Sequence, residues 1–201
     1  MSKKKITLLE TKNPPLEGRE ANPWKILSEK EIYNNPWIKL TEYDVINPSG
    51  GKGIYGKVHF KNVAVGIIPL DEEMNIWMVG QYRFTINQYS WEIPEGGGIV
   101  GTDPLEAAKR ELREETGLIA DKWTETMRLF LSNSVSDEFC IIFLAQQLQL
   151  KNAMPEETEK IMVKKIPFSE AYKMVQKGII TDAISVAAIQ KIKLMMNDGL
   201  L

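Results

Sequence analysis

Three glutamates stand close together in the segment KRELREETGL, at positions 111, 114 and 115. If this segment is helical, a rotation of about 100° per residue places Glu111, Glu114 and Glu115 within one arc of the helix surface. Carboxylates at this spacing repel one another unless a cation lies among them. Their oxygens suit a hard divalent ion, and Mg²⁺ is commonly held by carboxylates together with substrate phosphates. The spacing therefore indicates a metal site that acts on phosphate.

The residues around these glutamates predict a helix that begins after Asp103 and ends before Gly117. Asp103 is a favourable N-cap, Pro104 suits the first helical position, and Gly117 is a favourable C′ residue. A second, apolar stripe would pack on the core and turn the acidic face toward a cleft. This stripe consists of Leu105, Ala108 and Leu112.

The alternative is a solvated helix whose glutamates merely pair with Lys109, Arg110 and Arg113. The glycine-rich run EGGGIVG directly before the helix argues against that alternative. We expect instead that Arg110 orients Glu114 through a charge-assisted hydrogen bond.

Residues 92–118 resemble the signature of the Nudix hydrolases. That pattern has a glycine, a glutamate after five further residues and, after seven more, Arg-Glu-aliphatic-any-Glu-Glu-any-Gly-aliphatic. Gly96 takes the first position, and the nine residues from Arg110 to Leu118 fill the last part. Thr102 stands where the pattern has its first glutamate, which bears on the rigidity of the loop and on the number of metal ions.

The resemblance implies an α+β fold, a Nudix-type α/β/α sandwich with a mixed sheet and an N-terminal β extension. It implies Mg²⁺-dependent hydrolysis, with Mn²⁺ as an expected substitute. The residues that correspond to metal ligands are Glu111, Glu114, Glu115 and the backbone carbonyl of Glu95. The structural residues of the signature are Gly96, Arg110 and Gly117.

Three segments outside the signature resemble the branch that hydrolyses ADP-ribose and nucleoside diphosphate sugars: VGQYRF, SNSVSDE and GIITDAISVAAI. This resemblance implies cleavage of substrates such as ADP-ribose or GDP-mannose to a nucleoside monophosphate and a sugar phosphate. It also implies a homodimer that exchanges its N-terminal strands. We therefore expect residues 1–60 to form an N-terminal arm and strands for dimerisation, and residues 61–201 to form the Nudix hydrolase domain.

Several residues are candidates for contacts with the substrate. Arg83 would neutralise phosphate, unless it is only an exposed arginine at a sheet edge. Trp37 or Trp24 would stack on the nucleobase, because an aromatic face accepts any base; either could instead lie in the core or a dimer interface. Glu92 would lie near the metals or the substrate, or would pair with a nearby arginine.

The general base has four candidates. The loop before the last strand often supplies it in related enzymes, which favours Glu159 and then Glu157 in EETEK. Glu138 of SNSVSDE is a rival and a further candidate for substrate binding. Glu115 is the fourth, since one member of a crowded carboxylate group can have a raised pKa. Each loop glutamate could also be a solvated side chain without a role.

Composition narrows the class of protein. A formal net charge of −2 predicts no general affinity for nucleic acid or an anionic membrane. No apolar run approaches the ~20 residues of a membrane span, and the N-terminus lacks the pattern of a signal peptide. The single cysteine, Cys140, excludes an internal disulfide and is expected in a buried strand, while the single histidine, His59, excludes a multi-histidine metal site. These features favour a cytoplasmic protein.

The remaining pattern predicts strands over much of residues 37–167 and helices over 168–177 and 182–196. Residues 1–35 are interpreted as an extended arm, and the apolar runs 62–71 and 76–83 as a hairpin. Two other functions compete: hydrolysis of nucleoside triphosphates or dinucleoside polyphosphates, and a non-catalytic sensor of nucleotide sugars. The intact helix glutamates argue against the sensor, and the N-terminal arm and late acidic loop argue against the other hydrolase.

Overall fold

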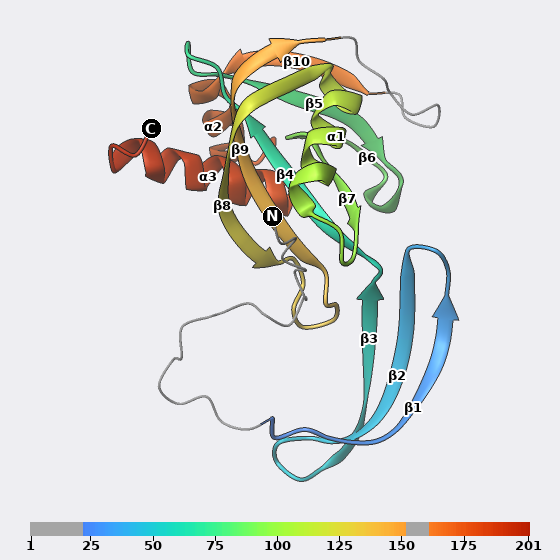
Figure 1. Ribbon diagram of the computed structural model, residues 1–201. Helices are drawn as coiled ribbons and strands as arrows, with labels where there is room; N and C mark the ends of the chain where they lie inside the picture. Colours follow the sequence, from blue (N-terminus) through green and yellow to red (C-terminus); the bar gives the residue numbers. More distant parts are fainter. Residues whose placement is uncertain (1–21, 152–160) are drawn as a thin grey trace, which may run out of the picture.

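The computed structural model describes residues 22–151 and 161–201 of the chain. In this part of the chain, a layered body lies beside a separate antiparallel N-terminal sheet (Figure 1). The N-terminal sheet has the order β1-β2-β3, formed by β1 (Lys25–Asn34), β2 (Ile38–Ile46) and β3 (Lys52–Phe60). Residues 25–34 are therefore a paired strand, and the prediction of an extended arm up to residue 35 is wrong for them.

Two sheets form the middle of the body. The first has the order β7-β4-β9-β8 and is mixed, because β4 and β9 are parallel while the other pairs are antiparallel. Its strands are β4 (Asn62–Pro69), β7 (Glu95–Ile99), β8 (Leu118–Phe130) and β9 (Phe139–Leu150). The second sheet has the order β10-β5-β6, with β5 (Asn75–Arg83), β6 (Gln88–Glu92) and β10 (Met162–Pro167); η1 (Phe84–Ile86) joins β5 to β6.

Helices cover both faces of these sheets, which gives the expected α/β/α sandwich (Figure 1). α1 (Pro104–Thr116) lies on one side, and α2 (Phe168–Gln176) and α3 (Ala183–Asn197) lie on the other. β9 is buried on both faces because its apolar side chains alternate: Ile141 and Phe143 pack in the α1 core, and Ile142 and Leu144 in the α2–α3 core. The continuous apolar runs of β4 and β9 follow from this arrangement.

The predicted hairpin of residues 62–71 and 76–83 is wrong. β4 and β5 belong to different sheets, and a single bridge between Leu70 and Ile76 joins their ends. Both runs are mostly buried, which explains their apolar, strand-like composition. An apolar run does not specify which strand it pairs with. The glycine-rich segment before the helix, expected as a loop, forms β7 along the edge of β4.

The predicted boundaries of α1 are confirmed. The Asp103 side chain accepts a hydrogen bond from the Leu105 amide, and Gly117 ends the helix with a left-handed φ of 73°. Ala108 and Leu112 are fully buried against β4 and β9. Cys140 is a buried thiol on β9 as expected, and burial raises its pKa. No helix in the described ranges is long and apolar enough to cross a membrane.

Gly66 marks the closest approach of β4 to α3. A Cβ atom there would lie 2.5 Å from Ile184 Cγ2 and 3.2 Å from Ile93 Cδ1. We predict that Gly66→Ala lowers the free energy of unfolding by about 1–3 kcal/mol, because the overpacked core must shift. Urea unfolding measures this change. Gly53→Ala is the control, since its Cβ would meet nothing within 4 Å, and equal losses in the two variants would contradict the prediction.

Candidate active site

The three signature glutamates of α1 line one cleft of about 350 Å³. The other residues that line it come from α1 itself, the start of β7, the start of β4, the segment before β2 and the residue before β10. The complete set is Trp37, Asn62, Glu95, Gly96, Gly97, Arg110, Glu111, Glu114, Glu115 and Ile161. The structure thus brings the carboxylates predicted as metal ligands to one place, together with the predicted aromatic residue Trp37.

The absence of a side chain at Gly96 lets β7 approach α1. A Cβ atom on Gly96 would lie 2.2 Å from the Glu111 carboxyl carbon, so any larger residue would displace that carboxylate. The backbone also holds the glutamates directly. The Gly97 amide donates to Glu111 Oε1 at 3.2 Å, and the Glu95 amide donates to Glu115 Oε2 at 3.0 Å. The close approach of Gly96 to the Glu111 carboxylate is the physical reason for a glycine at the first position of the signature.

Arg110 is the cation that faces these glutamates. Its Nη1 donates to Glu114 Oε2 at 2.5 Å, which confirms the expected bond, and its Nη2 donates to Glu111 Oε1 at 2.6 Å. Nη2 also donates to the Gly97 carbonyl oxygen at 2.9 Å, so one guanidinium joins the helix to β7. Such charge-assisted bonds fix the orientation of the carboxylates.

Burial raises the pKa of Glu111 in spite of Arg110, whose charge and hydrogen bond act in the opposite direction. Glu115 is buried within the protein, with 6% of its surface exposed. Partly desolvated carboxylates that converge in one cleft are the oxygen donors that a hard divalent ion requires. The close approach at Gly96 leaves room for these donors and a backbone carbonyl to lie together, so the residues fit such an ion.

Thr102, which replaces the first signature glutamate, does not line this cleft. Its hydroxyl donates to the Ile99 carbonyl oxygen at 2.7 Å and closes the turn between β7 and α1. Thr102 is exposed. The substitution therefore leaves the turn tied by a local hydrogen bond and leaves the cleft to the helix glutamates and Glu95.

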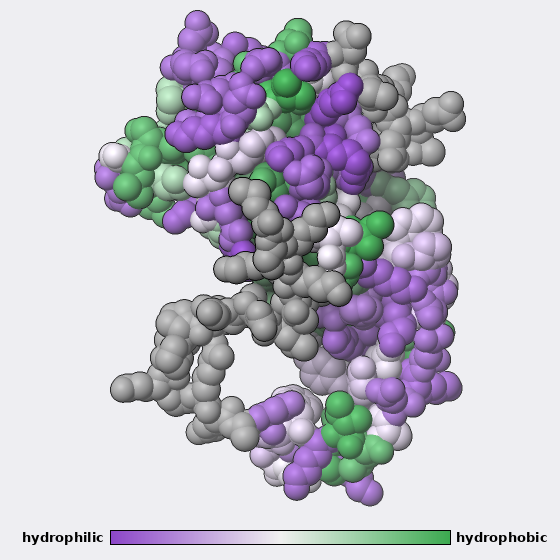
Figure 2. All heavy atoms as spheres, viewed as in Figure 1, coloured by the Kyte–Doolittle hydropathy of each residue, from purple (hydrophilic) through white to green (hydrophobic). Residues whose placement is uncertain are grey.

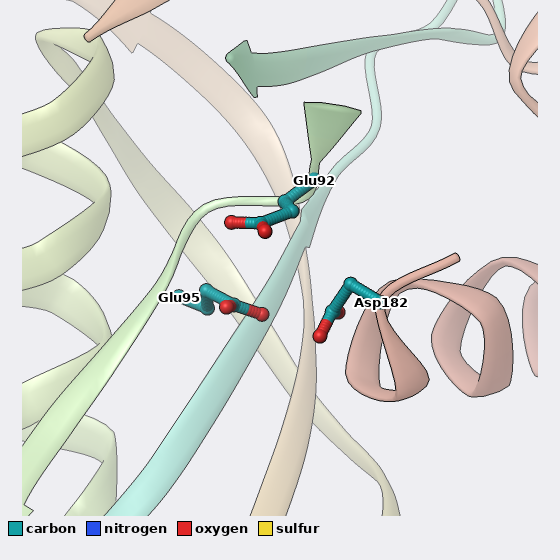
Figure 3. A group of neighbouring side chains, drawn as sticks. All are labelled: Glu92, Glu95 and Asp182. Carbon is teal, nitrogen blue, oxygen red and sulfur yellow. The ribbon is translucent and has the colours of Figure 1, made fainter. Parts of the chain in front are cut away.

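A second group of carboxylates lies beside the first. Glu92 from the end of β6, Glu95 from the start of β7 and Asp182 before α3 point toward one another (Figure 3), and an oxygen of each lies within 4.8 Å of the others. Glu95 belongs to both groups, since it also lines the cleft. No local pattern in the sequence indicates this arrangement for Asp182 or for the Glu95 side chain, because the three residues come from three different elements.

Arg83 neutralises part of this second group. Its Nε donates to both Glu92 oxygens at 3.0 Å, and its Nη2 donates to Glu92 Oε2 at 2.5 Å and to Glu95 Oε1 at 2.6 Å. Burial acts to lower the pKa of Arg83, but the bond to Glu92 and the charge of Glu95 raise it overall. Glu92 therefore pairs with a nearby arginine, which was one of the two roles considered for it. Arg83 is held by two carboxylates and is not merely an exposed arginine at a sheet edge.

One oxygen of the Glu95 carboxylate is left without compensation. Its Oε2 is buried and has no hydrogen-bond partner in the described part of the chain. Burial raises the pKa of Glu95 well above its usual range, and the nearby charges of Asp182 and Glu92 raise it further. A protonated or cation-bound Glu95 relieves this repulsion.

The remaining predicted site residues lie elsewhere. Glu138 is half-buried before β9, and its pKa is raised by burial and by the charge of Asp182. Trp24 lies away from the glutamate cleft, in edge-to-face contact with Tyr55 at 5.3 Å between ring centroids. Glu157 and Glu159 lie outside the described residues.

Comparison with known proteins identifies the family of this chain. Residues 60–183, more than half of the chain, match the NUDIX domain family. The chain belongs to the Nudix hydrolases. Residues 24–58 match a second family, described as the nucleoside diphosphate sugar hydrolase N-terminal domain, so this Nudix hydrolase belongs to the nucleoside diphosphate sugar pyrophosphatases.

Curated relatives extend over most of this Nudix hydrolase. The ADP-ribose pyrophosphatase of Bacillus subtilis is 31% identical over 172 residues, which are 85% of this chain and 92% of that protein. The ADP-ribose pyrophosphatase of Mycobacterium tuberculosis is 33% identical, over 83% of this chain and 81% of that one. The methanol dehydrogenase activator of Bacillus methanolicus is 30% identical, over 85% of this chain and 92% of that protein.

Among solved structures, a crystal structure of an ADP compounds hydrolase has a TM-score of 0.80 and 20% sequence identity. It covers 92% of this chain and 100% of that one. At this identity the likeness establishes the fold. It includes the N-terminal sheet as well as the body, since nearly the whole chain is covered.

The raised pKa of Glu95 predicts a distinctive pH dependence of stability in this Nudix hydrolase. Between the unfolded pKa near 4.5 and the higher folded pKa, the folded state binds more protons, so stability falls as pH rises. Glu95→Gln removes this contribution, which has a slope of at most about 1.4 kcal/mol per pH unit. Urea unfolding of both proteins from pH 5 upward, in EDTA, should show the wild type losing stability faster. Parallel curves would contradict the assignment.

Proposed function

We propose that this Nudix hydrolase cleaves the pyrophosphate bond of nucleoside diphosphate sugars such as ADP-ribose and GDP-mannose. The products are a nucleoside monophosphate and a sugar phosphate. One observation supports this proposal most strongly: the three helix glutamates, the Glu95–Gly97 backbone and Trp37 line the same cleft. An anionic site with an aromatic residue at its edge suits a divalent ion, a diphosphate and a nucleobase together.

In this proposal, Mg²⁺ is held by Glu111, Glu114, Glu115 and the backbone carbonyl of Glu95, and Mn²⁺ substitutes for it. When bound, the ion supplies neutralisation of the phosphate oxygens and a lowered pKa for an attacking water. The chain itself supplies orientation. Arg110 holds Glu111 and Glu114 in place, and the Gly97 and Glu95 amides hold Glu111 and Glu115, so little reorganisation is required when substrate binds.

We assign the substrate contacts to Trp37 in the cleft, to Arg83, which pairs with the second carboxylate group, and to Glu138. Trp37 is 65% exposed, so its ring is accessible for stacking on a nucleobase. Arg83 uses Nε and Nη2 for Glu92 and Glu95, and we propose that Nη1 donates to a substrate phosphate. Glu92 acts by fixing the Arg83 guanidinium, and we propose that Glu138 contacts substrate or water.

Glu159 is the favoured general base in this proposal, followed by Glu157, Glu138 and Glu115. Ile161, which follows the segment that carries Glu157 and Glu159, lines the cleft. Glu115 is engaged by the Glu95 amide.

We propose that residues 1–60 dimerise by exchanging N-terminal strands and that residues 61–201 form the catalytic domain. All ten residues of β1 are exposed, and β2 and β3 are mostly exposed or half-buried. Figure 2 shows hydrophobic surface at the end of the N-terminal sheet farthest from the body. The exposed large apolar side chains of β1 and β3 include Ile26, Leu27, Ile32 and Ile54. A surface of this kind marks an interface with another chain.

The metal assignment is tested with Glu114→Gln and Glu115→Gln, which keep side-chain size and remove one charge. We predict that each lowers kcat for AMP release from ADP-ribose with Mg²⁺ by about 100-fold or more, because the ion loses a ligand. Folding should persist, since glutamine at 115 can still accept the Glu95 amide hydrogen bond. Glu106→Gln is the control, because Glu106 pairs with Lys109 on the exposed side of α1. Unchanged rates in both variants would refute the assignment.

The dimer is tested by sedimentation velocity. We predict a dimer for the wild-type protein and a shift toward monomer for Ile54→Asp, because a charge is introduced at a side chain that is 70% exposed on β3. Leu194→Asp is the matched control on α3, where the leucine is 58% exposed. A monomeric wild-type protein would contradict the proposal, as would equal dissociation of the two variants.

A further inference from the structure

The loop of residues 132–138 between β8 and β9 is fastened to β3 of the N-terminal sheet. The Val58 amide donates to the Val135 carbonyl oxygen at 2.9 Å, and the Asp137 amide donates to the Val58 carbonyl oxygen at 3.2 Å. These bonds form an isolated parallel bridge between Val58 and Ser136. The Tyr55 hydroxyl adds a bond to the Ser134 carbonyl oxygen at 2.6 Å. One short loop is therefore tied to a strand about 80 residues earlier in the chain.

The Asp137 carboxylate is the centre of this attachment. Its Oδ1 accepts the Phe60 amide hydrogen bond at 3.0 Å, and its Oδ2 lies 2.8 Å from Lys57 Nζ and 2.7 Å from His59 Nδ1. Burial alone would raise the pKa of Asp137, but the bonds from Lys57, His59 and the Phe60 amide lower it overall. All three partners are on β3, so a single side chain joins the loop to the N-terminal sheet.

Glu138 follows Asp137 directly and leads into β9. Its carbonyl oxygen accepts the Leu131 amide hydrogen bond at 3.1 Å, which closes the base of the loop. Where the chain enters a strand, successive side chains point to opposite sides. With Asp137 turned toward β3, Glu138 is turned away from β3; burial, and secondarily the charge of Asp182, raise the pKa of Glu138. Asp182 adjoins Glu95, which lines the glutamate cleft.

We propose that Asp137 is a positioning residue: it fixes residues 132–138 to β3 and thereby orients Glu138 toward the reaction site. The N-terminal sheet then has a second role besides the one proposed in dimerisation, since β3 sets the geometry of a loop of the catalytic domain. This inference rests on the proposed function, which gives Glu138 a contact with substrate or water. An interaction that merely stabilised the fold would not depend on Glu138.

A double-mutant cycle distinguishes these roles. Asp137→Ala, Glu138→Gln and the double variant are compared by kcat and KM for ADP-ribose with Mg²⁺. We expect Asp137→Ala to lower kcat by about 10-fold or more with little change in KM, because misplacement of a reacting group slows the chemical step. The double variant should be no slower than Glu138→Gln, since removal of Glu138 removes what Asp137 positions. Single effects that multiply in the double variant would overturn the proposal, as would an unchanged kcat in Asp137→Ala.

Two further variants provide a milder substitution at Asp137 and a matched control. Asp137→Asn keeps the shape and the acceptor for the Phe60 amide, so it should fold even if Asp137→Ala does not, and its kcat should lie between those of Asp137→Ala and the wild type. Asp71→Ala is the matched control: Asp71 also accepts backbone amides and pairs with Lys165 at 2.7 Å, but it belongs to the turn between β4 and β5. Its kcat should match that of the wild type.

Amide hydrogen exchange measures the attachment independently of activity. Residues 132–138 should exchange faster in Asp137→Asn than in the wild type, and at the wild-type rate in Asp71→Ala. If residues 132–138 exchange at the wild-type rate in an active Asp137→Asn enzyme, the proposed role of Asp137 in holding the loop is wrong, while the proposed hydrolase function still stands. A wild-type protein that hydrolyses no nucleotide sugar would refute the proposed function and, with it, the role assigned to Glu138.

Discussion

The repulsion among carboxylates gathered between β7 and α1 is the constraint on which the site depends. Glu111, Glu114 and Glu115 share one cleft, and Glu95 joins this group to a second one formed with Glu92 and Asp182. Arg110 faces the first group and Arg83 the second. Each arginine is shared between two carboxylates of its group, so this pairing offsets their repulsion only in part. In a polar cleft, the negative charge that remains favours a divalent cation.

The rest of the fold holds these charges together against their repulsion. Ala108 and Leu112 anchor α1 in one core, while Ile184 and Ile189 anchor α3, and with it Asp182, in the other. β4 lies between both cores and pairs with β7, which carries Glu95 and Gly96. Burial of apolar surface on both faces of the sheets thus stabilises an arrangement of carboxylates that electrostatics alone would disperse.

Much of this site was predictable because its key residues are close in sequence. The caps of α1, its buried stripe, the bond from Arg110 to Glu114 and the convergence of the three glutamates all follow from helical geometry. The pairing of β4 with β9, the group of Glu92, Glu95 and Asp182, and the attachment of Asp137 to β3 did not follow. They join residues that are distant in the chain, and no local pattern specifies such partners. The predicted hairpin of β4 and β5 failed for the same reason.

The metal site proposed at the α1 glutamates can be located without reference to activity, by anomalous diffraction from crystals grown with Mn²⁺. We predict a peak in the cleft, within coordination distance of Glu111, Glu114, Glu115 and the Glu95 carbonyl oxygen. A peak only among Glu92, Asp182 and the Glu95 side chain would contradict it, as would an ordered cleft without Mn²⁺ in crystals that contain the ion at millimolar concentration.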